Sequence, residues 1–197
     1  MAFNVRFRRP IAIVGGSDPT DRQYEIASAI AERLAEKGWP IICGGRTGIM
    51  QAAAEGAHHG GGICVGILPD LNEATAKQST ATLVIPTDLG SHSSAICEAP
   101  NSRGPRDVSR NRIIVASALC VVAVGGGSGT ANEIKLALQF GKTVIRVAGA
   151  PAPQPFDPET EPPPKGKLVS VDSSREAIEA IESILKTVSE QWRIDSE

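Results

Sequence analysis

Three glycine-rich segments of the chain have the composition of phosphate-binding loops. Each follows a short apolar run and precedes a segment in which apolar residues recur at helical spacing. Glycine lets the backbone approach a ligand closely, and the amides at the start of the following helix favour an anion. Three such segments in one chain therefore predict a site for a phosphorylated ligand. The predicted ligand-binding residues in these loops are Gly15, Gly16, Ser17, Gly44, Gly45, Arg46, Thr47, Gly48, Gly126, Gly127, Ser128, Gly129 and Thr130.

Glu133 follows Thr130 by three residues, and this spacing has two interpretations. A Thr-x-x-Glu sequence can form a capping box, in which each side chain accepts from the other residue's amide and no function is required. A carboxylate directly behind an anion-binding loop would also lie at the mouth of the site. The sequence leaves open whether Glu133 caps a helix or takes part in chemistry.

Arg110 and Asn111 stand in a predicted helix, residues 108–117, which precedes the strand leading into the third loop. Near the start of that helix, Arg110 would lie at the same rim of the sheet as the loops. Its guanidinium could bind a phosphate there or pair with Glu133. The alternative is a solvated arginine at a helix start.

Two common nucleotide-binding motifs are absent from the glycine-rich loops. No lysine follows any of them, as a Walker P-loop requires, so phosphoryl transfer is disfavoured. A G-x-G-x-x-G fingerprint that begins at Gly125 continues with Gly127 but then has Thr130 instead of glycine. The acidic residue expected at the end of the next strand is also missing, so NAD is disfavoured as well.

Composition excludes several further classes of partner. The net charge of −2 and the pI near 6.0 give no basic footprint, so we expect no nucleic acid as a partner. No apolar run approaches the roughly 18 residues that cross a bilayer, so we expect no membrane segment and a cytoplasmic location.

The cysteines and histidines do not form a metal-binding or disulfide framework. The histidines have no partner at ligand spacing beyond Glu55, so we expect no metal site. The cysteines are widely spaced and three lie in apolar runs, which is typical of buried structural thiols. The residues concerned are Cys43, Cys64, Cys97, Cys120, His58, His59 and His92.

Apolar runs alternate with helical periods along most of the chain. Runs that are apolar throughout, joined by helices, indicate a parallel sheet covered on both faces. The fold class predicted is α/β: a Rossmann-like, doubly wound parallel sheet with helices on both faces, in a single nucleotide-binding domain of residues 1–197. The predicted strands are residues 11–14, 40–43, 63–68, 82–85, 120–124, 143–147 and 168–171.

Two segments fit neither pattern. Residues 149–167 contain seven prolines and cannot join a helix or a sheet interior, so we expect an extended surface excursion. Residues 88–107 are too long and aperiodic for an ordinary connection, and we expect a lid or a ligand-contacting loop there.

Two motifs resemble those of the Lonely Guy, or lysine decarboxylase-like, proteins of the SLOG superfamily. "GGSGTANE" resembles their P-G-G-x-G-T-x-x-E signature, and "CGGRTGIMQAAAEGA" resembles their earlier G-G-G-x-x-G-x-M loop. These proteins are cytokinin riboside 5′-monophosphate phosphoribohydrolases. The resemblance implies that Arg110 and Glu133 match the catalytic arginine and glutamate of that family.

The "RN" start of the predicted helix, the "GGGSGT" loop and the "NEIKLAL" segment are more similar to the branch that contains molybdenum cofactor carrier proteins. Four positions also depart from the Lonely Guy motifs. Gly125 stands where the signature has proline, Asn132 replaces a glutamate, Cys43 replaces a loop glycine and Asn111 replaces a lysine. The branch binds the phosphorylated pterin cofactor without turning it over. It implies the molybdenum cofactor as ligand, a homodimer or homotetramer, and molybdoenzymes as acceptors.

Three functions therefore stand as alternatives. The first is a carrier that binds molybdopterin or another phosphorylated heterocycle. The second is a phosphoribohydrolase, in which Glu133 assists water or stabilises an oxocarbenium-like charge while Arg110 helps to hold the 5′-phosphate. The third is a sensor of nucleotide-derived ligands.

Overall fold

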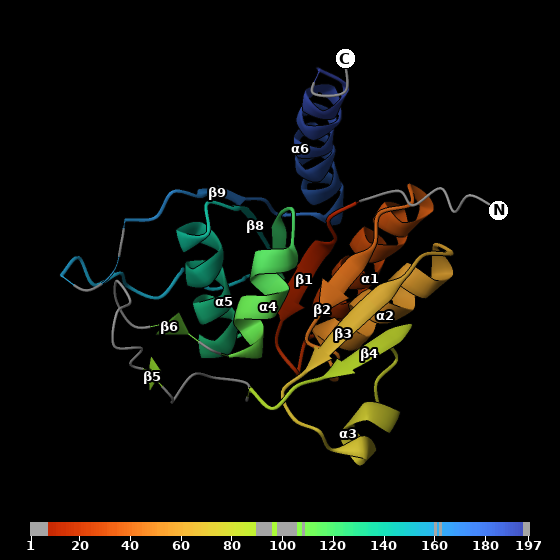
Figure 1. Ribbon diagram of the computed structural model, residues 1–197. Coiled ribbons are helices and arrows are strands. Elements are labelled where there is room, and N and C mark those ends of the chain that lie inside the picture. Colours follow the sequence, from red (N-terminus) through yellow and green to blue (C-terminus); the bar gives the residue numbers. More distant parts are fainter. Residues whose placement is uncertain are drawn as a thin grey trace.

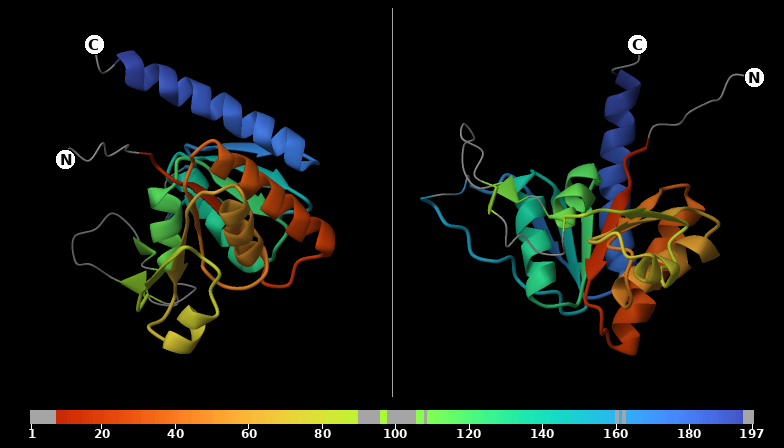
Figure 2. Two further views of the ribbon diagram at one scale, coloured as in Figure 1. Left: turned by 90° about the vertical axis from the view of Figure 1, so that its right-hand side faces the viewer. Right: turned by 60° about the horizontal axis from the view of Figure 1, so that its bottom comes forward.

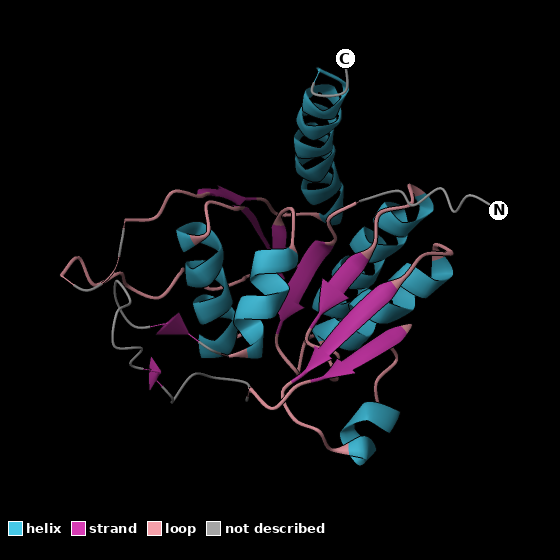
Figure 3. Cartoon of the chain, in the orientation of Figure 1, coloured by secondary structure: helices cyan, strands magenta, loops and turns pink. Residues whose placement is uncertain are grey.

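Seven short strands, most of them apolar, form one parallel sheet in the order β4-β3-β2-β1-β7-β8-β9. The computed structural model describes residues 8–89, 96–97, 106–107, 109–159, 161 and 163–194. Figure 1 shows the strands with their helices, and in Figure 3 the arrows of β1 to β4 point in a common direction. The strands are β1 (Ile11–Gly15), β2 (Ile41–Cys43), β3 (Cys64–Leu68), β4 (Leu83–Pro86), β7 (Val121–Val124), β8 (Thr143–Val147) and β9 (Lys167–Ser170).

Helices cover both faces of the sheet. Helices α1, α2 and α6 pack on one face, and α4 and α5 pack on the other. A two-residue pair, β5 (Ile96–Cys97) and β6 (Arg106–Asp107), lies outside the sheet. The helices are α1 (Asp21–Glu36), α2 (Ile49–His59), α3 (Glu73–Lys77), α4 (Arg110–Ser117), α5 (Ser128–Gln139) and α6 (Ser174–Ile194).

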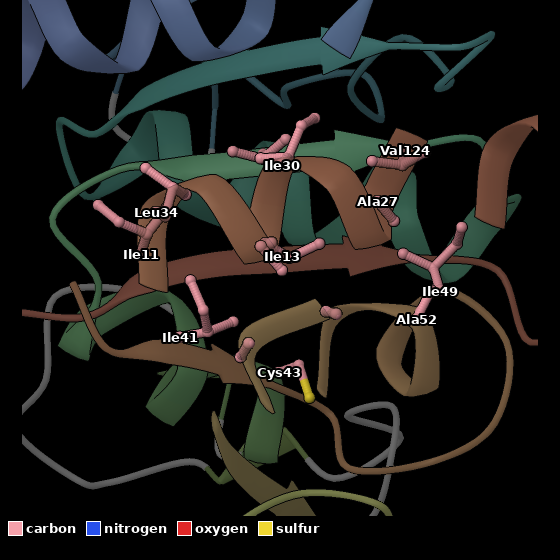
Figure 4. Packing of buried hydrophobic residues seen from close by; sticks show 14 of the residues in the cluster. Ile11, Ile13, Ala27, Ile30, Leu34, Ile41, Cys43, Ile49, Ala52 and Val124 are labelled. Carbon is pink, nitrogen blue, oxygen red and sulfur yellow. The ribbon is translucent and has the colours of Figure 1, made fainter. Parts of the chain in front are cut away.

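The core has two parts because successive side chains of a strand point to opposite faces. In β1, Ile11 and Ile13 join the cluster under α1 and α2, whereas Ala12 and Val14 join the cluster under α4 and α5. Figure 4 shows the first cluster, with Ile30 of α1 above β1. These residues are apolar on both faces, as the predicted doubly wound fold requires, so the fold class is confirmed.

The proline-rich excursion at residues 149–167 lies against α5. Gln154 N donates to Ala131 O at 3.3 Å, and Gly166 N donates to Leu138 O at 2.8 Å. Lys135 of α5 forms an ion pair with Glu161 at 2.6 Å and lies 5.6 Å from the ring centroid of Phe156. We call this segment the proline-rich strap, because it spans α5 from its first turn to its end.

The lid expected at residues 88–107 falls mostly outside the described residues. Figure 2 shows that the C-terminal part of α6 extends away from the sheet. Within the described ranges, no helix has the length and apolar character needed to cross a membrane.

Candidate functional site

A cavity of about 300 Å³ opens at the carboxyl ends of β1, β2 and β7. Ligands of open α/β sheets bind at this edge, where connections diverge to opposite faces. Strand β1 pairs with β2 on one side and with β7 on the other, so the three loops that follow these strands meet around it. The lining residues are Val14, Gly15, Gly16, Ser17, Gly44, Arg46, Met50, Arg110, Asn111, Gly127, Ser128, Gly129, Thr130 and Glu133.

The backbone of the loop after β1 touches the backbones of the other two loops. A Cβ on Gly48 would lie 2.6 Å from Ser17 O, and a Cβ on Gly126 would lie 3.1 Å from Gly16 N. Both glycines also have positive φ, 74° and 96°, which other residues rarely adopt. The loop after β1 therefore holds the other two loops against itself.

Twelve of the sixteen predicted ligand-binding residues line the cavity, and four do not. Gly48 and Gly126 lie where loops pack together, Gly45 packs against Gly66 of β3, and Thr47 is exposed. Two lining residues, Val14 and Met50, were not predicted. Met50 stands in the first turn after the second loop, and that position is the signal that could have identified it.

A capping box with Thr130 as the N-cap would start the helix at Ala131, whereas α5 begins at Ser128, three residues earlier. Its N-cap is Gly127, and within the described part of the chain no side chain caps it. The capping-box interpretation of Thr130 and Glu133 is therefore wrong, because both residues lie inside the helix. The first turn of α5 lines the cavity, and among the described residues it has neither a side-chain cap nor an acidic residue within it.

Arg110 is buried rather than solvated, with 6% of its surface exposed. Its Nη1 donates to Gly44 O and, at 2.7 Å, to Ile67 O. Helix α4 begins at Arg110, so this side chain connects the start of α4 to the ends of β2 and β3. Its burial lowers the pKa of the guanidinium, an effect that the charge of Glu133 opposes.

Polar atoms at the start of α4 are buried without a hydrogen-bond partner. Asn111 is 3% exposed, and neither its Oδ1 nor Arg110 Nε has a partner in the described residues. A buried polar atom without a partner costs about 1–3 kcal/mol, and such atoms in a native structure often mark a place where a ligand or water binds.

Glu133 lines the cavity from α5, one turn after the third loop, and 9% of its surface is exposed. Burial raises the pKa of its carboxyl group to about 7, against the opposing effect of Arg110. A carboxylic acid with this pKa can hold or release a proton near neutral pH. Arg46 also lines the cavity but is exposed.

Cys43 and Cys64 lie beneath the second loop, with their Sγ atoms 3.7 Å apart. Together with Cys120 they are buried free thiols, which agrees with the structural role predicted for them. The side chain of Cys97 is outside the described residues. The described ranges hold no cluster of three or more His, Cys, Asp or Glu side chains that could bind a metal ion.

Comparison with known sequences identifies relatives over most of the chain. A sequence model of the SLOG cluster4 family matches residues 8–178. An uncharacterized protein of Archaeoglobus fulgidus is 37% identical over 134 residues, which make up 68% of this chain and 76% of that protein.

Solved structures with the same fold include molybdenum cofactor proteins. The molybdenum cofactor binding protein of Rippkaea orientalis is 28% identical, with a TM-score of 0.68, and covers 91% of this chain and 99% of its own. The molybdenum cofactor carrier protein of Chlamydomonas reinhardtii is 29% identical, with a TM-score of 0.67 and the same coverage.

Proteins that process DNA share the fold as well. A putative DNA processing protein DprA of Mycobacterium tuberculosis is 30% identical over 146 residues, which span 72% of this chain but only 37% of that protein. DprA of Helicobacter pylori, a single-stranded DNA binding protein, is 19% identical, with a TM-score of 0.59, and covers 88% of this chain and 80% of its own.

Proposed function

The chain belongs to the SLOG cluster4 family, and from this premise we propose that it carries a phosphorylated heterocycle of the molybdopterin or nucleotide type. The resemblance to the SLOG superfamily and its molybdenum cofactor carrier branch is confirmed by the family match and by the solved structures. The ligand itself is our proposal.

The observation that supports this function most strongly is the meeting of three glycine-rich loops at one cavity. The loop amides and the uncapped start of α5 would hold the phosphate between Gly127 and Thr130. Arg46 would lie beside the anion, while Arg110 would keep the second loop in place through Gly44 O. The unpartnered amide oxygen of Asn111 suits a ligand that donates a hydrogen bond.

Retention of molybdopterin by the recombinant protein tests the proposal. We expect the protein to bind and protect molybdopterin more tightly than it binds inorganic phosphate or AMP. Equal binding of all three would remove the pterin from the proposal and leave a general phosphate site. A single-stranded oligonucleotide belongs in the same panel because the DprA relatives act on DNA, and we expect no binding of it.

A hydrolase is the second candidate, and the raised pKa of Glu133 favours it. A buried glutamate beside a phosphate site can act as a general acid or base on the glycosidic bond of a nucleoside 5′-monophosphate. Incubation with AMP and cytokinin monophosphates would then release free base and ribose 5-phosphate. Release that disappears in Glu133→Gln would make the hydrolase the better account.

Assembly with further copies completes the proposal. The molybdenum cofactor carrier branch implies a homodimer or homotetramer and molybdoenzymes as acceptors. Sedimentation of the purified protein measures the oligomeric state, and transfer of bound cofactor to an apo-molybdoenzyme tests the acceptor.

A further inference from the structure

Glu133 is a buried acidic residue in a cavity whose other features favour an anion. It stands three residues after Thr130 on α5, and side chains three apart on a helix lie about 5–6 Å from each other. An anion at the first turn of α5 would therefore lie close to the Glu133 carboxyl group, and the two negative charges would repel each other in a buried site.

We propose that Glu133 makes the site proton-linked: the carboxyl group carries a proton while an anionic ligand occupies the cavity, and its ionisation at higher pH releases the ligand. This inference rests on the proposed function, since it assumes that the cavity binds an anion. It adds to that function a way to load and unload the ligand.

The charged and titratable groups around Glu133 come from α4, from β2 and from the segments that follow β2 and β3. Arg110 of α4 favours the ionised carboxylate, and the exposed Arg46 lines the same cavity. Cys43 of β2 interacts with both Glu133 and Arg110, and Asp70, which follows β3, acts on Arg110. Burial outweighs the single favourable charge, so the carboxyl group of the free protein titrates with a pKa of about 7.

A bound anion adds an unfavourable charge to the effect of burial, so the pKa of Glu133 must rise further in the complex. Linkage is reciprocal: if the anion favours the protonated carboxyl group, protonation favours the anion by the same factor. The complex then binds more protons than the free protein above pH 7, and affinity falls as pH rises. Each unit of pKa increase on binding gives a tenfold loss of affinity between the two plateaus.

Inorganic sulfate is the suitable probe, because it stays a dianion from pH 6 to 8.5. A phosphate monoester has a second pKa near 6 and would add its own titration. We expect calorimetry of the wild-type protein to show affinity for sulfate falling about tenfold across this range. We also expect proton uptake on binding when two buffers of different ionisation enthalpy are compared at pH 7.5.

Two variants separate this linkage from a general effect of pH. Glu133→Gln should bind sulfate with an affinity that is flat across the range. Glu55→Gln should keep the wild-type dependence, because Glu55 of α2 bonds Tyr24 and Gln51 outside the lining of the cavity.

Several outcomes would overturn the inference. Sulfate affinity that is constant with pH in the wild type, or a pH dependence that persists in Glu133→Gln, removes Glu133 as the linked group but leaves the proposed function standing. If Glu133→Gln does not fold, carbon-detected NMR titration of Glu133 in the wild type, with and without sulfate, gives the answer: an unchanged pKa overturns the linkage. No binding of sulfate, phosphate or AMP at any pH would instead remove the proposed function.

Discussion

The guanidinium of Arg110 lies directly against Gly44 and donates to its carbonyl group. The same Nη1 bonds Ile67 O at the end of β3, so one buried side chain fixes two strand ends relative to α4. This arrangement leaves no space for a side chain at position 44. Because Nη1 already donates to two backbone carbonyl groups, Arg110 cannot use all of its N–H groups to bind a ligand.

Gly44→Ala should destabilise the protein by about 1–3 kcal/mol, because the new Cβ overpacks a filled region. The Cβ would lie 2.6 Å from Met50 Sδ and would also overlap Arg110. Urea unfolding measures the change. Gly127→Ala is the matched control: its Cβ would meet no atom of the described residues within 4 Å, so we expect a loss below about 1 kcal/mol. Equal losses in the two variants would contradict the close approach of Arg110 and Gly44.

Arg110→Met should cost about 3 kcal/mol in the free energy of unfolding. It leaves Gly44 O and Ile67 O without their donor, and hydrogen bonds from a charged group contribute about 1.5–3 kcal/mol each. The pKa of Glu133 should rise further, because Arg110 is the charge that lowers it. Urea unfolding and NMR titration measure the two effects. An unchanged Glu133 pKa would show that the two side chains do not interact.

Glu133→Gln should remove a pH dependence of stability. The folded-state pKa of Glu133 is raised from 4.5 to about 7, so the folded protein holds a proton that the unfolded chain releases. The wild type is therefore most stable, relative to the variant, below about pH 4.5 and loses roughly 3 kcal/mol as pH rises through 7. Unfolding of both proteins at pH 5, 6, 7 and 8 measures this difference. Parallel stability curves would mean that Glu133 is not buried in its neutral form.

The ion pair between Lys135 and Glu161 should couple the proline-rich strap to α5. Its two side chains are 14% and 21% exposed, and their charged atoms lie 2.6 Å apart. A double-mutant cycle with Lys135→Met and Glu161→Gln should give a coupling energy of about 1–2 kcal/mol.

The pair between Arg175 and Glu179 on α6 is the matched control for that cycle. Its side chains are 87% and 60% exposed, so water and salt screen the interaction. We expect a much smaller coupling energy there. Similar values for both pairs would mean that the strap gains nothing from its partial burial on α5.

The fold was predictable from the sequence because its strands are apolar throughout and its helices repeat at regular spacing. Both ends of each of the seven predicted strands lie within one residue of the observed strand boundary. The first turn of α5 was placed three residues late, because glycine and serine at 127–129 have low helix propensity. Tertiary packing and the loop contacts determine where that helix begins, and a local pattern does not contain that information.

The candidate site was predictable as a set of loops but not as a set of contacts. Glycine at the end of a strand indicates that the backbone is approached closely there. This prediction does not depend on knowing which strands are neighbours in the sheet. The burial of Arg110 depends on which carbonyl groups lie opposite it, and these come from residues 44 and 67, far away in the chain. Val14 and Met50 carry no polar group, so nothing in their chemistry marked them as part of the cavity.

The proline-rich strap joins β8 to β9, two parallel neighbours that proteins usually connect through a helix. Because its prolines carry no amide hydrogen, this connection is held by a few separate backbone bonds and side-chain contacts rather than by a continuous ladder of backbone bonds. Exposed positions between these contacts, such as Glu159, are therefore suited to an attached fluorophore. A dye at that position would report changes in the packing of the strap on α5, and Glu159 is not among the residues that line the cavity.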